Sequence, residues 1–113
     1  MKKIKIKKDS YRKSRGGSSE LLNLGCTQCG SNVAIYQKDG KGSLLRTYVD
    51  RFHLPEVLVN EIEKHDNTSD MPNLECSNCN ELLGTPMMYK SEKRLAFRLV
   101  RGKVKTSFFK NEN

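Results

Sequence analysis

The sequence predicts a mainly β domain with one short helix, in which two C-x-x-C turns sit on β-hairpins. Three observations support this fold class. Short segments rich in β-branched and aromatic residues recur along the chain. A single stretch, after Pro55, carries apolar residues at helical spacing. All four cysteines fall in two C-x-x-C pairs. The length of 113 residues fits one compact domain.

Residues 1–20 are expected to form a flexible basic arm with a Gly/Ser linker, ahead of a folded domain over residues 21–110. Residues 1–15 carry a net charge of +7 and end in a Gly-Gly-Ser-Ser stretch. Such arms commonly neutralise nucleic-acid phosphates, although a solubilising tail has the same composition. The alternation of Ile4 and Ile6 leaves an added edge strand as a third interpretation.

The first half of the domain predicts a hairpin. Val, Ile and Tyr favour a strand over residues 31–37, and two glycines in residues 38–42 suit a tight turn. Residues 43–52 are expected to form the return strand.

Pro55 is expected to open a short helix, because proline is well suited to a first helical position. Val57, Leu58 and Ile62 would form its apolar stripe. Residues 66–73 are expected to form a loop.

The last third of the chain predicts strands over residues 85–90, 94–100 and 103–109, with a tight turn at Arg101-Gly102 before the last one. The second strand alternates with a period of two. Its apolar face holds Leu95, Phe97 and Leu99, and its other face holds Arg94 and Arg98.

The two cysteine pairs predict a metal site. Cys26 and Cys29 form the first C-x-x-C, Cys76 and Cys79 form the second, and 46 residues separate the two pairs. Four thiolates suit a tetrahedral Zn²⁺, and a rubredoxin-like iron site has a similar ligand set. Gly30 directly follows the first pair and Asn80 the second, as expected where the turn needs a positive φ.

Other roles for these cysteines fit less well. A redox C-x-x-C needs one pair in a βαβ context, which the sequence does not predict. The N-terminus shows no signal peptide and the chain has no membrane-length apolar run, which predicts a cytoplasmic protein whose thiols stay reduced. A closed four-thiolate site is structural and leaves no position for a catalytic water.

The cysteine arrangement resembles zinc-ribbon proteins over roughly residues 24–109, and in particular the Mss4-like fold group, in which two knuckles on separate hairpins pin a β-sheet. That group includes the zinc scaffold of methionine sulfoxide reductase B. The reductase relation would imply a further nucleophilic cysteine and tryptophans around the substrate. This chain has no fifth cysteine and no tryptophan, which excludes that activity. Residues 36–51 and 82–89 also resemble a small microbial zinc-ribbon family. This resemblance implies the fold and no particular activity.

Charge predicts the partner. The net charge of +8 divides into +7 for residues 1–15, +1 for 16–53, −6 for 54–84 and +6 for 85–113. A basic arm and a basic C-terminal hairpin fit nucleic acid or a ribonucleoprotein, with RNA favoured over DNA and exposed tyrosines available to stack on bases. The candidate contacts are Lys2, Lys3, Lys5, Lys7, Lys8, Arg12, Lys13, Arg15, Arg94, Arg98, Arg101, Lys103 and Lys105.

Two rival interpretations stay open. The basic hairpin can be an ordinary solvated sheet face, and the acidic segment over residues 54–84 can dock a protein partner. No nucleotide-binding or nucleophile motif accompanies His53 or His65, so a non-catalytic module is expected. His53 is expected to be held by local contacts and His65 to lie at the end of the helix.

Overall fold

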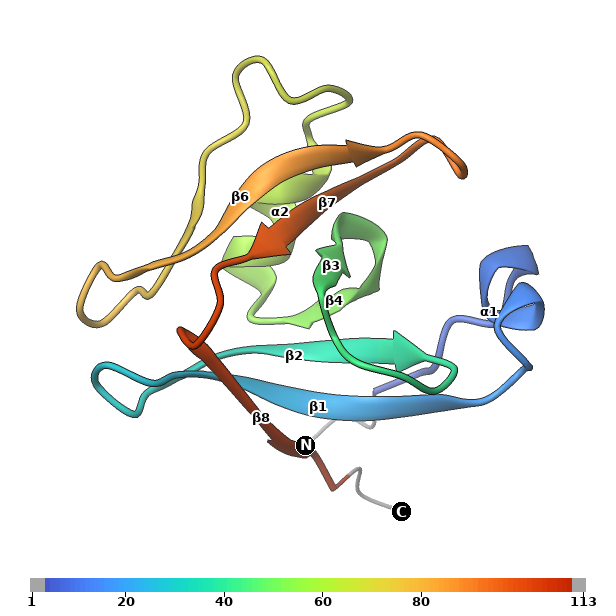
Figure 1. Ribbon diagram of the computed structural model, residues 1–113, viewed down its shortest axis with the longest axis horizontal. Helices are drawn as coiled ribbons and strands as arrows, with labels where there is room; N and C mark the ends of the chain where they lie inside the picture. Colours follow the sequence, from blue (N-terminus) through green and yellow to red (C-terminus); the bar gives the residue numbers. More distant parts are fainter. Residues whose placement is uncertain (1–3, 111–113) are drawn as a thin grey trace.

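The computed structural model describes residues 4–110 as two four-stranded antiparallel sheets with the core between them (Figure 1). In order across the sheet, sheet A consists of β4 (Phe52–Leu54), β2 (Asn32–Asp39), β1 (Ser19–Cys26) and β8 (Val104–Phe108). Sheet B consists of β3 (Arg46–Tyr48), β7 (Arg94–Leu99), β6 (Leu82–Tyr89) and β5 (Leu74–Glu75). The predicted mainly β class is confirmed.

Three rings connect the two sheets through the core. Phe52 of β4 packs edge-on against Tyr36 of β2, with centroids 5.2 Å apart, and against Phe97 of β7 at 6.0 Å. Phe97 is fully buried, and Leu95 and Leu99 pack beside it, as the period of two predicted. The core therefore joins strands that are far apart in the sequence.

The central strand β1 was missing from the sequence prediction. It lies between β2 and β8, and its Leu21, Leu22 and Leu24 are buried. These three leucines surround Asn23 immediately before the first cysteine pair. Leucine has no strong β preference, so the segment lacked the β-branched and aromatic composition by which the other strands were recognised.

The prediction of a single return strand over residues 43–52 is wrong. The chain instead divides this stretch between β3, which pairs with β7 in sheet B, and β4, which pairs with β2 in sheet A. A 3-10 turn, η1 (Val49–Arg51), carries the chain from one sheet to the other. At the crossing, the Tyr48 backbone N–H donates to the Tyr36 hydroxyl at 2.7 Å, which links the two sheets.

The prediction that the last two strands form a hairpin is also wrong. β7 stays in sheet B, whereas β8 crosses to sheet A and pairs with β1 (Figure 1). The connection is held on both sides, because the Val100 N–H donates to the Leu83 carbonyl and the Lys103 carbonyl accepts from Thr27. The basic residues of 94–105 consequently divide between two sheets.

Two α-helices are present among the described residues, one more than predicted. α2 (Glu56–Glu63) follows Pro55 as expected and buries Ile62. Val57 is 83% exposed, so it does not belong to the predicted apolar stripe. α1 (Ser10–Ser14) is a single turn capped by Asp9. Neither helix has the length and hydropathy needed to cross a membrane.

The N-terminal segment makes specific contacts where its composition predicted a flexible arm. The backbone of Lys7 exchanges two hydrogen bonds, both of 2.9 Å, with the side-chain amide of Gln37, which is fully buried on β2. Arg15 forms a bidentate ion pair with Glu92 in the β6–β7 turn. Lys7 and Arg15 thus dock this segment on partners that are 30 and 77 positions away in the sequence. Ile4 and Ile6 belong to no strand.

Arg51 is the buried cation to which this segment attaches. It is 1% exposed, and its guanidinium contacts Asp39 at 2.7 Å and Asp9 at 2.6 Å. Asp39 also accepts from Ser19 and Gln37, so its carboxylate is fully used inside the protein. The ion pair thus joins the N-terminal segment, β2 and η1 at one point.

We expect Arg51→Met to lower the free energy of unfolding by about 3–5 kcal/mol, because it leaves the Asp39 carboxylate buried without its cation. Urea denaturation measures the loss. Arg98→Met, at an exposed position, is the matched control and should change stability by no more than about 0.5 kcal/mol. Adding Asp39→Asn to Arg51→Met should restore part of the loss; equal stability of Arg51→Met and the parent would refute this account.

Asp9 makes the free energy of unfolding depend on pH. Its hydrogen bond to Arg51 lowers its pKa from 3.8 to about 2. Because the folded pKa is depressed, the stabilisation is complete above about pH 4 and is lost as the pH falls toward 2. Asp9→Asn keeps an N-cap oxygen but removes the charge, and since Asp9 is 40% exposed we expect a loss of only about 1 kcal/mol at pH 6. Urea unfolding of both proteins between pH 6 and 2.5 should show the difference shrinking; a pH-independent difference contradicts the assignment.

Candidate metal centre and basic surface

The four cysteines come together at one end of the two sheets. Cys26 ends β1 and Cys29 lies in the turn to β2, whereas Cys76 and Cys79 lie between β5 and β6. Their four Sγ atoms all lie within 4.8 Å of one another. Each pair thus belongs to a different sheet, and both connecting turns lie at the same side of the molecule (Figure 1, left).

The two turns have matching backbone geometry. In the first, Gly30 has a φ of 81° and its N–H donates to the Cys26 carbonyl at 2.8 Å. In the second, Asn80 has a φ of 64° and its N–H donates to the Cys76 carbonyl, also at 2.8 Å. The left-handed conformation predicted at both positions is confirmed, and asparagine tolerates it better than other side chains do.

The sulfur spacing fits a tetrahedral ion. The Sγ atoms of Cys26 and Cys79 are 3.7 Å apart, and those of Cys29 and Cys76 are 3.6 Å apart. Zinc–sulfur bonds near 2.3 Å in a tetrahedron place the sulfurs about 3.8 Å from each other. The cluster can therefore hold one metal ion, with two buried ligands, Cys26 and Cys76, and two ligands near the surface.

The electrostatics of the thiols also favour a cation at the centre. Hydrogen bonds from Asn78 and Ser31 lower the pKa of Cys29 to about 5. The Glu81 backbone N–H lowers the pKa of Cys79, but burial and the neighbouring sulfurs outweigh it and raise that pKa to about 12. Four thiolates this close repel one another unless a positive ion neutralises them.

Two lysines of the predicted nucleic-acid stripe lie beside the cysteine cluster instead. Lys103 pairs with Glu81 at 2.7 Å, and this contact and the nearby Cys26 raise its pKa. The stem of Lys105 packs over β1, where a Cβ added at Gly25 would lie 3.1 Å from its Cγ and Cε atoms. A divalent ion with four thiolates would keep a charge of −2, which these ammonium groups are placed to compensate.

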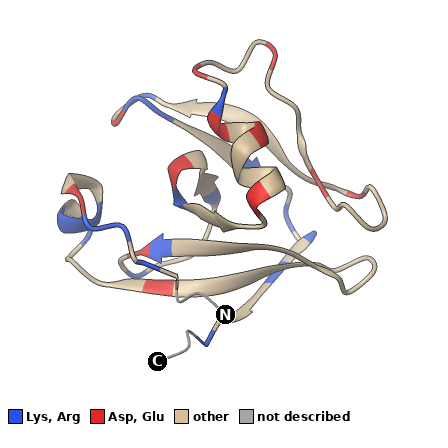
Figure 2. Cartoon of the chain, turned by 180° about the vertical axis from the view of Figure 1, so that it is seen from behind, with Lys and Arg blue, Asp and Glu red and all other residues tan. Residues whose placement is uncertain are grey.

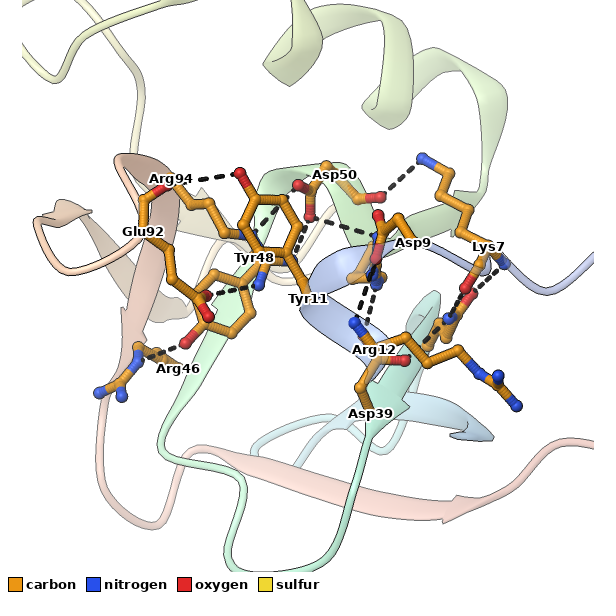
Figure 3. A network of polar contacts seen from close by, with 12 residues as sticks. Lys7, Asp9, Tyr11, Arg12, Asp39, Arg46, Tyr48, Asp50, Glu92 and Arg94 are labelled. Atoms are coloured by element: carbon orange, nitrogen blue, oxygen red, sulfur yellow. Dashed lines mark hydrogen bonds and ion pairs between the residues drawn. The ribbon is translucent and has the colours of Figure 1, made fainter. Parts of the chain in front are cut away.

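Arg94 was predicted as an exposed phosphate contact, but it is 4% exposed. Its guanidinium forms ion pairs with Asp50 at 2.6 Å and Glu92 at 2.9 Å. It also lies 4.1 Å from the ring centroid of Tyr11 and 3.8 Å from that of Tyr48 (Figure 3). Arg94 is thus an internal cation that connects α1 to sheet B.

The remaining predicted contacts divide into two groups. Three have partners inside the protein. Lys7 donates a hydrogen bond to the Asp50 carbonyl, Arg12 donates one to the Ser19 hydroxyl, and Arg15 forms an ion pair with Glu92. Five are exposed and have no carboxylate partner among residues 4–110: Lys5, Lys8, Lys13, Arg98 and Arg101. Lys2 and Lys3 lie outside the described residues. Figure 2 shows basic residues around α1 and on β8, and acidic residues on α2 and the loop after it.

The sequence analysis missed Arg46. It lies on β3 directly opposite Arg98 of β7, so both side chains leave the same face of sheet B. Its guanidinium lies 4.1 Å from the ring centroid of Tyr89, and its Nε donates to the Tyr48 hydroxyl at 2.9 Å. We call Arg46, Tyr89 and Arg98 the sheet-B face. The pairing of two arginines across β3 and β7 was hidden because residues 43–52 were assigned to the wrong sheet.

Both histidines make local contacts. The His53 Nε2 lies 3.0 Å from the Gln37 side-chain oxygen, and burial lowers its pKa. His65 follows the end of α2, and its ring contacts Asp70.

No protein-family model matches the chain, and neither a curated protein nor a solved structure is significantly similar to it. The cysteine cluster is consistent with a zinc-ribbon-like site, and its assignment rests on the geometry of these residues alone.

Removing the metal should unfold the domain, because the ion joins two sheets whose cysteine turns have no other covalent link. We expect a strong chelator to abolish the cooperative thermal transition, and Cys76→Ser to prevent folding or lower the melting temperature severely. Ser77→Ala, in the same turn but outside the ligand set, is the matched control and should melt like the parent. An unchanged melting temperature in Cys76→Ser would show that the cluster has no structural role.

Proposed function

We propose that this chain is a non-catalytic, zinc-stabilised module that binds single-stranded nucleic acid through the sheet-B face. The observation that carries the proposal is the register of β3, β7 and β6. It places Arg46 beside Arg98, and Tyr89 within reach of Arg46, on one side of the sheet. One guanidinium over an aromatic ring, with a second arginine opposite it on the neighbouring strand, combines phosphate attraction with a stacking surface.

Zinc is the metal that we propose for the cysteine cluster. Four thiolates in a tetrahedral arrangement suit zinc, and iron is the alternative with the same ligands. Metal analysis of the purified protein separates them, since a colourless protein with one zinc per chain supports the proposal and a red protein with iron contradicts it.

The availability of the two arginines supports a role in binding. Arg98 is exposed, and neither Arg98 nor Arg46 has a carboxylate partner among the described residues. By contrast, Arg15, Arg51 and Arg94 are all neutralised by acidic side chains. The exposed lysines Lys5, Lys8 and Lys13 of the N-terminal segment add positive charge around α1. RNA is the favoured strand, because proteins read unpaired RNA bases by stacking on aromatic and arginine side chains.

A protein-docking role is the second candidate. α2 exposes Val57 in an acidic segment, residues 54–84, with a net charge of −6. An apolar side chain among carboxylates fits a basic protein partner. Capture from a lysate before and after nuclease treatment distinguishes the candidates, since a partner that resists nuclease supports docking.

We expect affinity for a short single-stranded RNA to fall steeply with salt, and Arg98→Glu and Arg46→Glu each to weaken it. Each lost phosphate contact should reduce the slope of log affinity against log salt by about 0.7. Fluorescence anisotropy with RNA and with DNA of the same sequence measures both effects. Lys64→Glu, the same charge change on the exposed end of α2, is the control. An RNA affinity that neither substitution changes would exclude the sheet-B face as the binding surface.

A further inference from the structure

A cavity of about 380 Å³ lies between β3, the loop from β2 to β3 and the end of α1. Its floor is formed by the buried side chains Tyr36, Tyr48 and Arg51, and its rim by the exposed Lys41 and Leu45. Its volume lies in the range of small-molecule sites. Tyr48 and Arg46 also line it, so the cavity opens beside the sheet-B face.

The cavity has a surplus of positive charge. Five cations line it, of which Arg15 and Arg51 are neutralised by Glu92 and Asp39. The other three have no carboxylate partner among residues 4–110: Lys38, Lys41 and Arg46. Among the described residues, the Lys38 ammonium has one hydrogen bond, to the Gly40 carbonyl. Asp39 is the one acidic residue in the lining, and its oxygens are occupied by Arg51, Ser19 and Gln37.

Two residues that line the floor carry a donor without an acceptor. The Arg51 Nη1 is buried and has no hydrogen-bond partner among residues 4–110, and it lies 3.8 Å from the Asp50 carboxylate. The Tyr48 hydroxyl accepts hydrogen bonds from Arg15 and Arg46, and no described residue accepts its own hydrogen. A buried donor without a partner is costly, and the Tyr48 hydroxyl keeps a hydrogen to donate. Together with three uncompensated cations, these residues suit an anion that carries several acceptor oxygens.

The walls are fixed in place. A Cβ added at Gly40 would lie 2.7 Å from the Arg15 carbonyl oxygen, so the loop can approach α1 only with glycine at this position. The Gly40 N–H also donates to the Ser18 carbonyl at 2.9 Å. The N-terminal segment thus supplies one wall of the cavity, and the floor belongs to the crossing between the two sheets. The cavity is consequently formed before a ligand arrives.

We propose that this cavity binds a phosphate monoester of a nucleotide. A monoester carries about two negative charges and three terminal oxygens, which match the cations and donors better than a singly charged diester or carboxylate does. Leu44 and Leu45 at the opening offer an apolar surface for the attached nucleoside. The phosphate belongs either to a free nucleotide or to the end of a nucleic-acid strand. The site goes beyond the function proposed above, because a free nucleotide would occupy it whether or not the sheet-B face binds a strand.

Isothermal titration of the metal-loaded full chain tests the site with adenosine 5′-monophosphate, adenosine and inorganic phosphate. We expect the monophosphate to bind, with adenosine at least tenfold weaker because it lacks the charged group. Lys41→Ala and Arg46→Gln should each weaken the monophosphate about tenfold, the effect of one charge-assisted hydrogen bond. Lys64→Ala is the matched control and should bind like the parent. Equal binding of adenosine and its monophosphate, or no effect of Lys41→Ala and Arg46→Gln, would overturn the proposal.

Oligonucleotides of one sequence with a 5′-phosphate, a 3′-phosphate or two hydroxyl ends identify the source of the group. Tighter binding of one phosphorylated end, lost in Lys41→Ala, assigns the cavity to that strand end. Equal binding of all three, with the monophosphate still bound, assigns it to a free nucleotide. Arg98 does not line the cavity, so Arg98→Glu separates the two proposals. It should weaken RNA and leave the monophosphate unchanged, and loss of the monophosphate in this variant would count against an independent site.

Discussion

The structure brings four cysteine sulfurs from both sheets together at one point, where a shared cation would relieve the repulsion between their thiolates. Cys26 and Cys29 belong to sheet A and Cys76 and Cys79 to sheet B, so neutralising the sulfurs also fixes one end of each sheet to the other. The core between the sheets is modest, and its ring contacts centre on Phe52. A bound ion would therefore contribute stability that the apolar residues of a chain this short supply only in part. Lys103 and Lys105 lie beside the cluster, where they would offset the negative charge that an occupied site keeps.

A second set of charges holds the other side of the molecule. Arg51 and Arg94 are both almost fully buried, and between them they contact Asp9, Asp39, Asp50 and Glu92. Breaking such a pair is more costly than its net contribution suggests, because an uncompensated charge stays inside the protein. The N-terminal segment is part of this arrangement, and its contacts with Gln37 and Glu92 make it a wall of the domain. From net charge alone, all of these cations would be assigned to an external ligand. Several of them instead pair with acidic side chains inside the protein, and only the rest are available to a ligand.

The features that the sequence predicted are those set by neighbouring residues. The spacing within each cysteine pair, the positive φ at Gly30 and Asn80, and the alternation that buries Phe97 all depend on short-range geometry. The failures share another cause. Whether residues 43–52 turn back along β2 or cross to β7, and whether Arg94 faces solvent or Asp50, depends on partners more than 40 positions away. A strand pattern contains no information about which sheet the strand joins, so Arg46 and the sheet-B face were not visible from the sequence.

The crossing at η1 connects the two halves of the functional argument. The 3-10 turn places Arg51 in the floor of the cavity, and the strand before it places Arg46 at the rim and Tyr48 between them. Both sheets hold this short stretch, through β3 in one and β4 in the other, and the Tyr48–Tyr36 hydrogen bond ties it to β2. A binding group on a segment fixed from two sides loses little conformational freedom when a ligand arrives. The crossing that the hairpin prediction missed therefore gathers Arg46, Tyr48 and Arg51 around one cavity. An uncompensated cation and a hydroxyl hydrogen without an acceptor at such a cavity suit a phosphate group.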